Sequence, residues 1–332
     1  MSCWYNNAAP EGDVVVSTRI RLARNINGYP FPARMSDEAR REVNAKIKAA
    51  IKADSKHNLK YIDMCDVPEN ERFSMVERHI ASREFVLKPD NKAILLSEDE
   101  TVSVMIGEED HIRIQVVLPG LQLNKAYSIA DDIDNMLCAS LDMAFDSTLG
   151  FLTECPTNLG TGLRASVMLH LPVSESRGEM LTLTESVNKI GYTVRGMYGE
   201  GSTAAGSLYQ ISNQITLGIS EKTAIDNLAV ITDEIVRKER ELQKSIKSIK
   251  TEDLCMRALG TLKFARALTS AELISLISHV KLGMNIGIIK EDINPIKILI
   301  EGQPYMLMKT YGNMTEDERD IKRADTVRNA LA

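Results

Sequence analysis

Three arginines, Arg19, Arg21 and Arg24, fall within six positions of the segment STRIRLAR, with no acidic residue among them. The apolar run VVV at 14–16 precedes this segment and predicts an extended strand. Residues two apart in a strand share a face, so we expect Arg19 and Arg21 to point the same way and Arg24 the other way. The whole chain carries a formal net charge of −6, so a local positive cluster of this kind indicates a site for an anion.

Other arginines stand in polar or glycine-bearing stretches beside expected strands: Arg113 in GEEDHIR, Arg164 in CPTNLGTGLRAS and Arg195 in VRGMYGEGS. A guanidinium group presents a planar fork that can bind phosphate oxygens bidentately. Several such groups converging from separate segments would form a polyphosphate site without the GxxxxGK[ST] loop, which the sequence lacks. The alternative is that each arginine simply lies on the solvated surface, as most arginines do.

Acidic residues form a second set. Glu108, Glu109 and Asp110 are consecutive at a strand boundary, and Glu200 lies in the loop segment GEGS. Two carboxylates that meet could hold one cation, and a guanidinium group is a natural candidate. Its pKa lies above about 12, so it must be oriented and must lose a proton before its nitrogen can attack. The alternative is a solvated turn at 108–110 and a plain surface loop around Glu200.

Cys155 precedes Pro156 in a polar loop and could act on the same cation. A thiol near arginines can have a lowered pKa, and its thiolate would then pair with a guanidinium group. The alternative is an inert, buried thiol.

Near the C-terminus, the segment ERDIKRA at 318–324 follows Thr315, which with Glu318 predicts a helix capping box. Arg319 and Arg323 are four residues apart and share a helix face, so together they could clamp a phosphate. Asp320 could hold a guanidinium group beside it. The alternative is an ordinary salt-bridged surface helix.

The surrounding pattern predicts strands at 92–97, 101–106, 111–118, 165–171, 192–197 and 207–218, and helices at 36–53, 125–146, 182–191 and 221–247. Strands and helices follow each other in irregular order, which favours an α+β fold with an antiparallel sheet flanked by helices. The strand signal vanishes after about residue 250. We therefore expect a catalytic domain at 1–249 and a small all-helical domain at 250–332.

Composition narrows the possible classes of function. The acidic balance argues against direct nucleic-acid binding. Five cysteines without a CxxC pair, and no signal peptide or long apolar span, favour the cytoplasm and no membrane association. The five histidines lack metal-ligand spacing, so no resident metal site is expected.

The segments STRIRLAR, GEEDHIR, CPTNLGTGLRASV and RGMYGEGSTAAGSLYQISN occur in one order and together resemble the phosphagen (guanidino) kinase family over about residues 13–220. The resemblance implies ATP and Mg²⁺ as cofactors and an antiparallel sheet flanked by helices. It also implies that Glu109 is the catalytic carboxylate, that Glu200 is a second carboxylate selecting arginine, and that Cys155 is a reactive cysteine near the guanidinium group. The residues that it implies for the nucleotide phosphates are Arg19, Arg21, Arg113, Arg164 and Arg195.

The chain departs from kinases of free arginine in two ways. The catalytic pattern begins near residue 13, without their N-terminal helical domain, and no counterpart of their adenine-stacking histidine is identified. A helical C-terminus with the motif RDxxRA at 319–324 resembles instead the bacterial protein arginine kinases. In that group the motif is implicated in phosphoarginine binding and dimerisation, which here implies Arg319, Asp320 and Arg323 as a phosphoarginine site.

The resemblance thus implies ATP-dependent phosphorylation of arginine side chains in proteins, as a mark in stress response and protein quality control. It implies as partners protein substrates with exposed arginines, including a repressor of stress genes, a zinc-binding activator protein, the Clp protease and a second copy of the chain. Two other functions stay open: a kinase for free arginine, and a non-catalytic adaptor that reads phosphoarginine.

Overall fold

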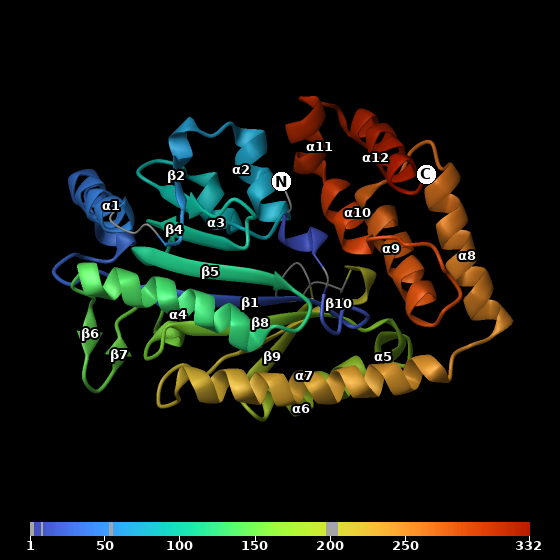
Figure 1. Cartoon of the computed structure of the whole chain (residues 1–332), viewed down its shortest axis with the longest axis horizontal. Coiled ribbons are helices and arrows are strands. Elements are labelled where there is room, and N and C mark those ends of the chain that lie inside the picture. Colours follow the sequence, from blue (N-terminus) through green and yellow to red (C-terminus); the bar gives the residue numbers. More distant parts are fainter. Residues whose placement is uncertain (1–2, 8, 53–55, 197–204) are drawn as a thin grey trace.

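In a computed structural model of the chain, which describes residues 3–7, 9–52, 56–196 and 205–332, the fold is built on one antiparallel sheet (Figure 1). Within the described residues the sheet has eight strands, in the order β2-β3-β4-β5-β1-β8-β10-β9, and every neighbouring pair is antiparallel. The strands are β1 (Val15–Arg24), β2 (Lys60–Asp63), β3 (Ala93–Leu96), β4 (Val102–Ile106), β5 (Ile112–Pro119), β8 (Leu163–His170), β9 (Tyr192–Gly196) and β10 (Leu208–Asn213). A separate hairpin pairs β6 (Phe145–Asp146) with β7 (Gly150–Phe151). The α+β class with an antiparallel sheet is confirmed.

Helices flank this sheet. They are α1 (Asp37–Lys52), α2 (Glu69–Glu77), α3 (Arg83–Leu87), α4 (Leu123–Ser140), α5 (Pro172–Ser176), α6 (Met180–Asn188), α7 (Glu221–Lys244), α8 (Ile249–Phe264), α9 (Ser270–Asn285), α10 (Pro295–Glu301), α11 (Pro304–Tyr311) and α12 (Glu316–Ala330). Not one of these described helices combines the length and apolar character that crossing a bilayer requires.

One face of the sheet is apolar because alternate residues of each strand point to it. Ile20 and Leu22 of β1 are fully buried there and belong to the main hydrophobic cluster. Helix α4 contributes Ala130 and Ile133 to the same cluster, and the long helix α7 contributes Leu228. Burial of this face against amphipathic helices is the main source of the sheet's stability.

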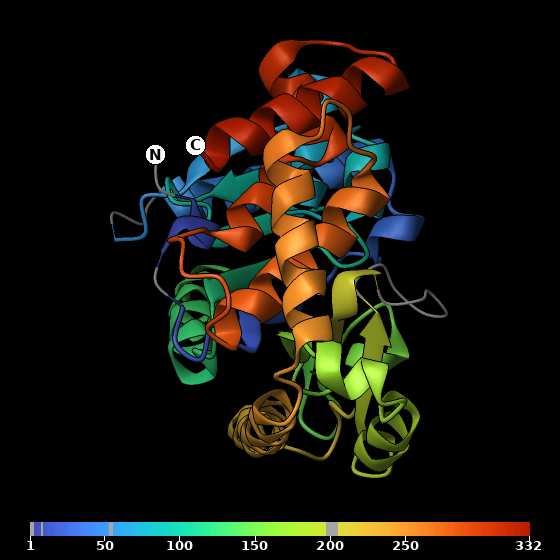
Figure 2. The same ribbon diagram turned by 90° about the vertical axis from the view of Figure 1, so that its right-hand side faces the viewer.

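The opposite face is covered at two places. Helices α2 and α3 pack over β3 and β4, where Phe85 contacts a cluster that includes Ile94 and Met105. Helices α9 and α10 pack over the far end, in a cluster with Val16 and Leu208. Figures 1 and 2 show the C-terminal helices α8 to α12 gathered at one end of the sheet. Between the two covers the middle of this face is lined by polar and charged side chains.

A bulge determines which residues of β1 point to each face of the sheet. Its register against β8 shifts between Val15 and Ser17, so the preceding valines divide between two clusters: Val15 belongs to the main cluster and Val16 to the cluster under α9 and α10. After the bulge, strict alternation returns through Arg24.

The predicted helix starts are largely confirmed. Ser36 accepts a hydrogen bond from the backbone N–H of Ala39, and the capping box of Thr315 and Glu318 is present. Thr269 caps α9 by accepting from the Glu272 N–H. Ser248 caps α8 by accepting from the Thr251 N–H. The division of the chain at 249/250 stays a prediction.

Candidate functional site

Pairing registers bring the predicted phosphate-binding arginines onto one face of the sheet. Arg21 of β1 lies opposite Arg164 of β8, and Ala23 lies opposite Arg113 of β5. Cross-strand partners point to the same side, and Arg21 and Ala23 are two residues apart. Arg21, Arg113 and Arg164 therefore share a face, and this is the face opposite Ile20.

Arg19 and Arg195 lie on the same face of the sheet, at positions next to these three arginines. Gln210 of β10 lies opposite both Arg195 of β9 and Met168 of β8, and Met168 is four residues from Arg164. A donor nitrogen of Arg19 is 2.5 Å from the Gln210 Oε1. Five arginines from β1, β5, β8 and β9 thus lie on one face of the sheet, although they are spread over 177 positions of the sequence from Arg19 to Arg195.

Arg24 points the other way, as the alternation predicted, and has a structural role. It is 2 % exposed and forms a bidentate ion pair with Asp134 of α4 at 2.6 Å. It also donates to the Thr161 carbonyl at 2.9 Å, and its guanidinium carbon lies 3.5 Å from the centre of the Phe151 ring. These partners saturate Arg24, so it is not available to a ligand.

A pocket of about 320 Å³ lies beside the arginine cluster, where Ala23 of β1 and Gly162 line it. It brings together most of the predicted site. Its lining residues are Arg21, Ala23, Glu109, Arg113, Cys155, Thr157, Asn158, Gly162, Arg164 and Arg195. An acid and a thiol therefore share one pocket with arginines, which is the arrangement needed to place a cation next to an anion.

The consecutive acids 108–110 have three different roles. Glu108 and Glu109 both form ion pairs with Arg113, the second at 3.0 Å, and Ser82 donates to Glu108. The Glu109 side chain is 38 % exposed and reaches the pocket, whereas Glu108 is 6 % exposed. Asp110 is fully buried and accepts from Asn25 at 2.6 Å and from the Glu154 N–H at 2.9 Å. Asp110 thus ties the loop that carries Cys155 to the edge of β5.

The Cys155 loop places its polar groups in the same pocket. The Cys155 Sγ lies 3.0 Å from the Thr157 Oγ1, and the Asn158 Oδ1 accepts a hydrogen bond from Arg164 at 3.4 Å. Gly162, at φ +64°, ends this loop, and a Cβ there would lie 2.6 Å from the Ala23 carbonyl oxygen. A side chain at this position would push the loop off β1, so glycine is required for close packing.

The electrostatics of the cluster favour an anionic ligand. Burial, and then the charges of Arg113 and Arg164, lower the pKa of Arg19 to about 10. Burial and the three neighbouring guanidinium groups hold the pKa of Arg21 well below its ordinary value. The Arg21 Nε is buried, and no hydrogen-bond acceptor meets it within the part of the chain that is described. Like charges held together in a low-dielectric site are stabilised by a ligand that supplies the opposite charge.

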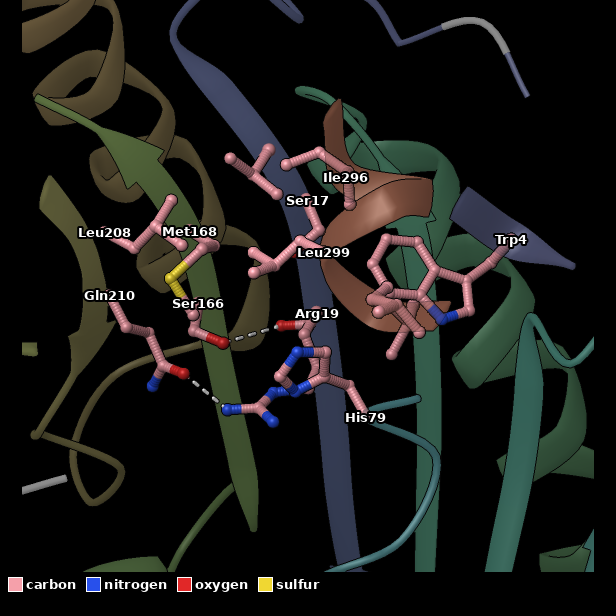
Figure 3. A pocket seen from close by; sticks show the side chains of 13 residues that line it. Trp4, Ser17, Arg19, His79, Ser166, Met168, Leu208, Gln210, Ile296 and Leu299 are labelled. Carbon is pink, nitrogen blue, oxygen red and sulfur yellow. Dashed lines mark hydrogen bonds between the residues drawn. The ribbon is translucent and has the colours of Figure 1, made fainter. Parts of the chain in front are cut away.

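A second pocket, of about 610 Å³, adjoins the first and shares Arg21 and Arg195 with it. Arg19 lines this second pocket together with His79 and Gln210. Burial, and then the charge of Arg19, lower the pKa of His79 to about 4, so the imidazole is neutral at pH 7. Figure 3 shows a smaller cavity, which Arg19, His79 and Gln210 line together with Trp4 and Leu299.

The C-terminal motif adopts a geometry that its spacing did not predict. Arg323 is 1 % exposed and donates to the Gly302 carbonyl at 2.7 Å and the Leu268 carbonyl at 2.6 Å, and it also pairs with Asp320. Arg319 is half-buried and makes one long hydrogen bond, to the Met314 carbonyl at 3.4 Å. The buried Arg323 of α12 therefore links this helix to the end of α10 and to the residue that precedes the N-cap of α9. Phosphoarginine binding by these residues stays a prediction.

The predicted site residues thus divide into three groups. Arg21, Arg113, Arg164, Arg195, Glu109 and Cys155 meet in the first pocket, and Arg19 lines the adjoining one. Glu200 lies outside the described residues. Arg319, Asp320 and Arg323 lie in the C-terminal helices and line neither pocket.

Sequence reasoning missed several residues that line the two pockets: Glu77, His79, Arg83, Thr157, Asn158 and Gln210. Thr157 and Asn158 stand in the quoted segment CPTNLGTGLRAS, and this proximity to Cys155 was a usable signal. Glu77, His79 and Arg83 had none, because they stand outside every quoted motif.

Two family models match the chain. The "ATP:guanido phosphotransferase, C-terminal catalytic domain" matches residues 42–242, and the "Protein-arginine kinase McsB C-terminal domain" matches residues 248–332.

Full-length relatives are similar throughout. A protein named "Protein-arginine kinase" from Clostridium acetobutylicum is 43 % identical over 342 residues, covering 100 % of both chains. A protein of the same name from Halothermothrix orenii is 42 % identical over 339 residues, covering 100 % of this chain and 97 % of its own.

Solved structures show a related fold. A lombricine kinase superposes with a TM-score of 0.64 at 25 % identity, covering 73 % of this chain and 70 % of its own. The duplicated taurocyamine kinase from Schistosoma mansoni, with bound transition state analogue components, also gives 0.64, at 28 % identity over 79 % of this chain and 39 % of its own.

Proposed function

The chain belongs to the ATP:guanido phosphotransferase family, and we propose that it is a protein-arginine kinase, which transfers the γ-phosphoryl group of ATP to arginine side chains of proteins. The observation that carries this proposal is the 320 Å³ pocket, in which arginines from β1, β5, β8 and β9 meet Glu109 and Cys155. The names of the relatives and the match at 248–332 support arginine in a protein as the acceptor.

The arginine cluster fits a triphosphate. Phosphoryl transfer requires alignment of the two substrates and neutralisation of charge on the transferred group, and fixed guanidinium groups supply both. Arg21 and Arg195 line both pockets, so phosphates bound by them would run from one pocket into the other. Mg²⁺ would supply further neutralisation at the phosphate oxygens. Among the described residues no group of three or more His, Cys, Asp or Glu side chains could hold a metal ion, and we propose that the nucleotide itself supplies oxygen ligands to Mg²⁺.

Glu109 is the proposed base. It reaches the pocket, and it shares Arg113 with Glu108, which can hold Arg113 by itself when Glu109 turns to the substrate. A carboxylate beside the acceptor guanidinium orients it and accepts the proton that the attacking nitrogen loses. Cys155 would stand next to the same guanidinium as a second partner, with its sulfur 3.0 Å from the Thr157 Oγ1. Glu200 is proposed as the second carboxylate on the evidence of the family resemblance alone.

The wider role is proposed on the same basis. Phosphorylation replaces the cationic side chain with a group of net negative charge, which would weaken the contacts of a DNA-binding substrate with DNA phosphates. We propose a cytoplasmic enzyme that marks proteins in stress response and quality control. The proposed partners are a repressor of stress genes, a zinc-binding activator, the Clp protease and a second copy of the chain.

The acceptor decides between the proposed function and its alternatives. The purified chain is incubated with Mg-ATP and either free arginine or a denatured arginine-rich protein, and the products are followed by phosphorus NMR. We expect a P–N resonance on the protein only. A signal on free arginine only would make the chain a kinase for free arginine. Absence of ATP turnover, with retained binding of phosphoarginine, would make it an adaptor.

A further inference from the structure

We propose that helix α10 of the C-terminal helices forms one wall of the nucleotide site, and that its residues Leu299 and Ile300 pack against the nucleoside of ATP. This proposal rests on the proposed function, because it assumes that the arginine cluster binds the phosphates of a nucleotide. It assigns to a C-terminal helix a direct part in substrate binding, in addition to any role of the motif at 319–324.

The two pockets give the bound nucleotide a direction. The smaller pocket holds Glu109 and Cys155, the groups suited to an acceptor guanidinium, so the transferred phosphoryl group must lie at that end. Arg21 and Arg195 line both pockets and would hold the phosphates between them. The remaining part of the nucleotide must then extend past Arg19 into the larger pocket, which lacks both Glu109 and Cys155.

The larger pocket has the size and the chemistry for a nucleoside. Its volume of about 610 Å³ lies within the range of small-molecule sites, roughly 300–1,000 Å³. Leu299 and Ile300 supply apolar surface, and the neutral imidazole of His79 is part of the same lining. Gln210 and Gln303 supply amide groups that can pair with the polar edge of a base. A flat, uncharged heteroaromatic ring meets each of these surfaces with a matching group.

Helix α10 is held firmly enough to act as a wall. Its N-cap Asn294 accepts from the Lys297 N–H and donates to the Tyr5 carbonyl at 2.9 Å. Arg323 donates to the carbonyl of Gly302, the residue that follows the helix, at 2.7 Å. Ile298 is buried in the cluster of the C-terminal helices. Leu299 and Ile300 therefore reach the pocket from a fixed position.

The opposite side of the pocket is tied to the same helices. Glu77 of α2 lines the pocket and accepts hydrogen bonds from the N–H groups of Tyr305 and Met306, at 3.0 and 2.7 Å, at the start of α11. Loss of the C-terminal helices would therefore open the pocket on two sides. A further cavity of about 30 Å³, next to Trp4, shows that the packing of α10 on the sheet is incomplete near Arg19 (Figure 3).

The fluorescence of Trp4 can report on binding next to α10. Trp4 is the single tryptophan of the chain, and it lines that cavity together with Leu299 and Ile300. Binding of ADP is followed by tryptophan fluorescence and by calorimetry, and compared with binding of inorganic tripolyphosphate, which has the phosphates without the nucleoside. The variant is Leu299→Ala. The matched control is Ile298→Ala, on the same helix and equally buried, but lining neither pocket.

We expect Leu299→Ala to weaken ADP binding about tenfold or more, since groups removed from an apolar pocket have effects of that size. Tripolyphosphate binding should stay within about twofold of the wild type, because the arginines are unchanged. Ile298→Ala should leave both affinities unchanged, although it lowers the melting temperature to a similar extent. If Leu299→Ala does not fold, Ile300→Val removes a single methyl group and should give a smaller loss of the same kind.

Two results would overturn the proposal, and they are distinguishable. If the wild type binds ADP and tripolyphosphate, but Leu299→Ala and Ile300→Val leave ADP binding intact or weaken both ligands equally, then α10 is no part of the nucleoside site and the kinase function stands. If the wild type binds neither ligand, then the phosphate site itself is refuted. The proposed function and the proposed role of α10 are then both wrong.

Discussion

Replacing Arg19 with methionine should make the free protein more stable and its nucleotide binding weaker. Arg19 lies between other guanidinium groups and among apolar side chains, including Trp4, Val117 and Leu299. Methionine has a similar length, no charge, and the flexibility to fill the space that is left. A buried charge replaced by a well-packed apolar side chain is often stabilising by about 1–4 kcal/mol.

The magnitude follows from the pKa of Arg19, which burial and neighbouring arginines lower to about 10. A lowered pKa means that the charged form is disfavoured in the folded state, and at pH 7 this penalty is fully present. At 1.36 kcal/mol for each unit of pKa, the difference from an ordinary arginine corresponds to roughly 3 kcal/mol. The lost hydrogen bond to Gln210 offsets about 1 kcal/mol of this gain. We expect a net gain of about 1–2 kcal/mol, and a melting temperature a few degrees higher.

The assay is differential scanning calorimetry of the wild type and of Arg19→Met, with Arg24→Met as a control on the same strand. Arg24 is buried with its counterion Asp134, so Arg24→Met leaves an unpaired carboxylate and should lose about 3–5 kcal/mol. Titration with ADP should show that Arg19→Met weakens binding by about ten- to a hundredfold. If Arg19→Met lowered the melting temperature as Arg24→Met does, the arginine face would not be strained by its own charge, and the inference of an anion site would fail.

Three further predictions concern single residues. Glu109→Gln should lose transfer to protein arginine, because the base is gone, while ADP binding measured by calorimetry is retained; normal turnover would show that another group takes the proton. Burial raises the pKa of Glu77 to about 7, so its contribution to stability is complete below about pH 4.5 and is lost as the pH rises through 7. Urea midpoints of the wild type should therefore fall relative to those of Glu77→Gln between pH 5 and 8, and parallel curves would contradict the assignment. Arg319→Ala should leave the melting temperature unchanged but reduce binding of free phosphoarginine, whereas Arg323→Ala should lower the melting temperature, because two carbonyls lose their buried donor. Unchanged phosphoarginine affinity in Arg319→Ala would remove that residue from the site.

What the sequence could predict was local. The alternation of β1 placed Arg19 and Arg21 together and Arg24 opposite, and the structure confirms this, because strand geometry fixes the direction of every second side chain. Spacing could not show that Arg113 and Arg195 face the same volume, since that depends on the register of strands far apart in the sequence. For those residues the family resemblance supplied the expectation.

The misses have the same physical origin. Helix α2 buries only Ser74 and Met75, too few to give a recognisable period, so the segment that carries Glu77 and His79 was not predicted. Spacing of four residues showed that Arg319 and Arg323 share a helix side, but not that Arg323 lies inside. Its burial depends on the packing of α12 against the end of α10, which no local pattern encodes.

The alternation of β1 also limits how this site can change in evolution. Deletion or insertion of one residue after the bulge would exchange the two faces of the strand. Arg19 and Arg21 would then point into the hydrophobic core, and Ile20 and Leu22 would point into water. Gains and losses of single codons within this strand should therefore be eliminated by selection, whereas substitutions that retune affinity remain open. Tolerance of length changes should begin at the irregular pairing between Val15 and Ser17, which can absorb an extra residue without exchanging the two faces of the strand.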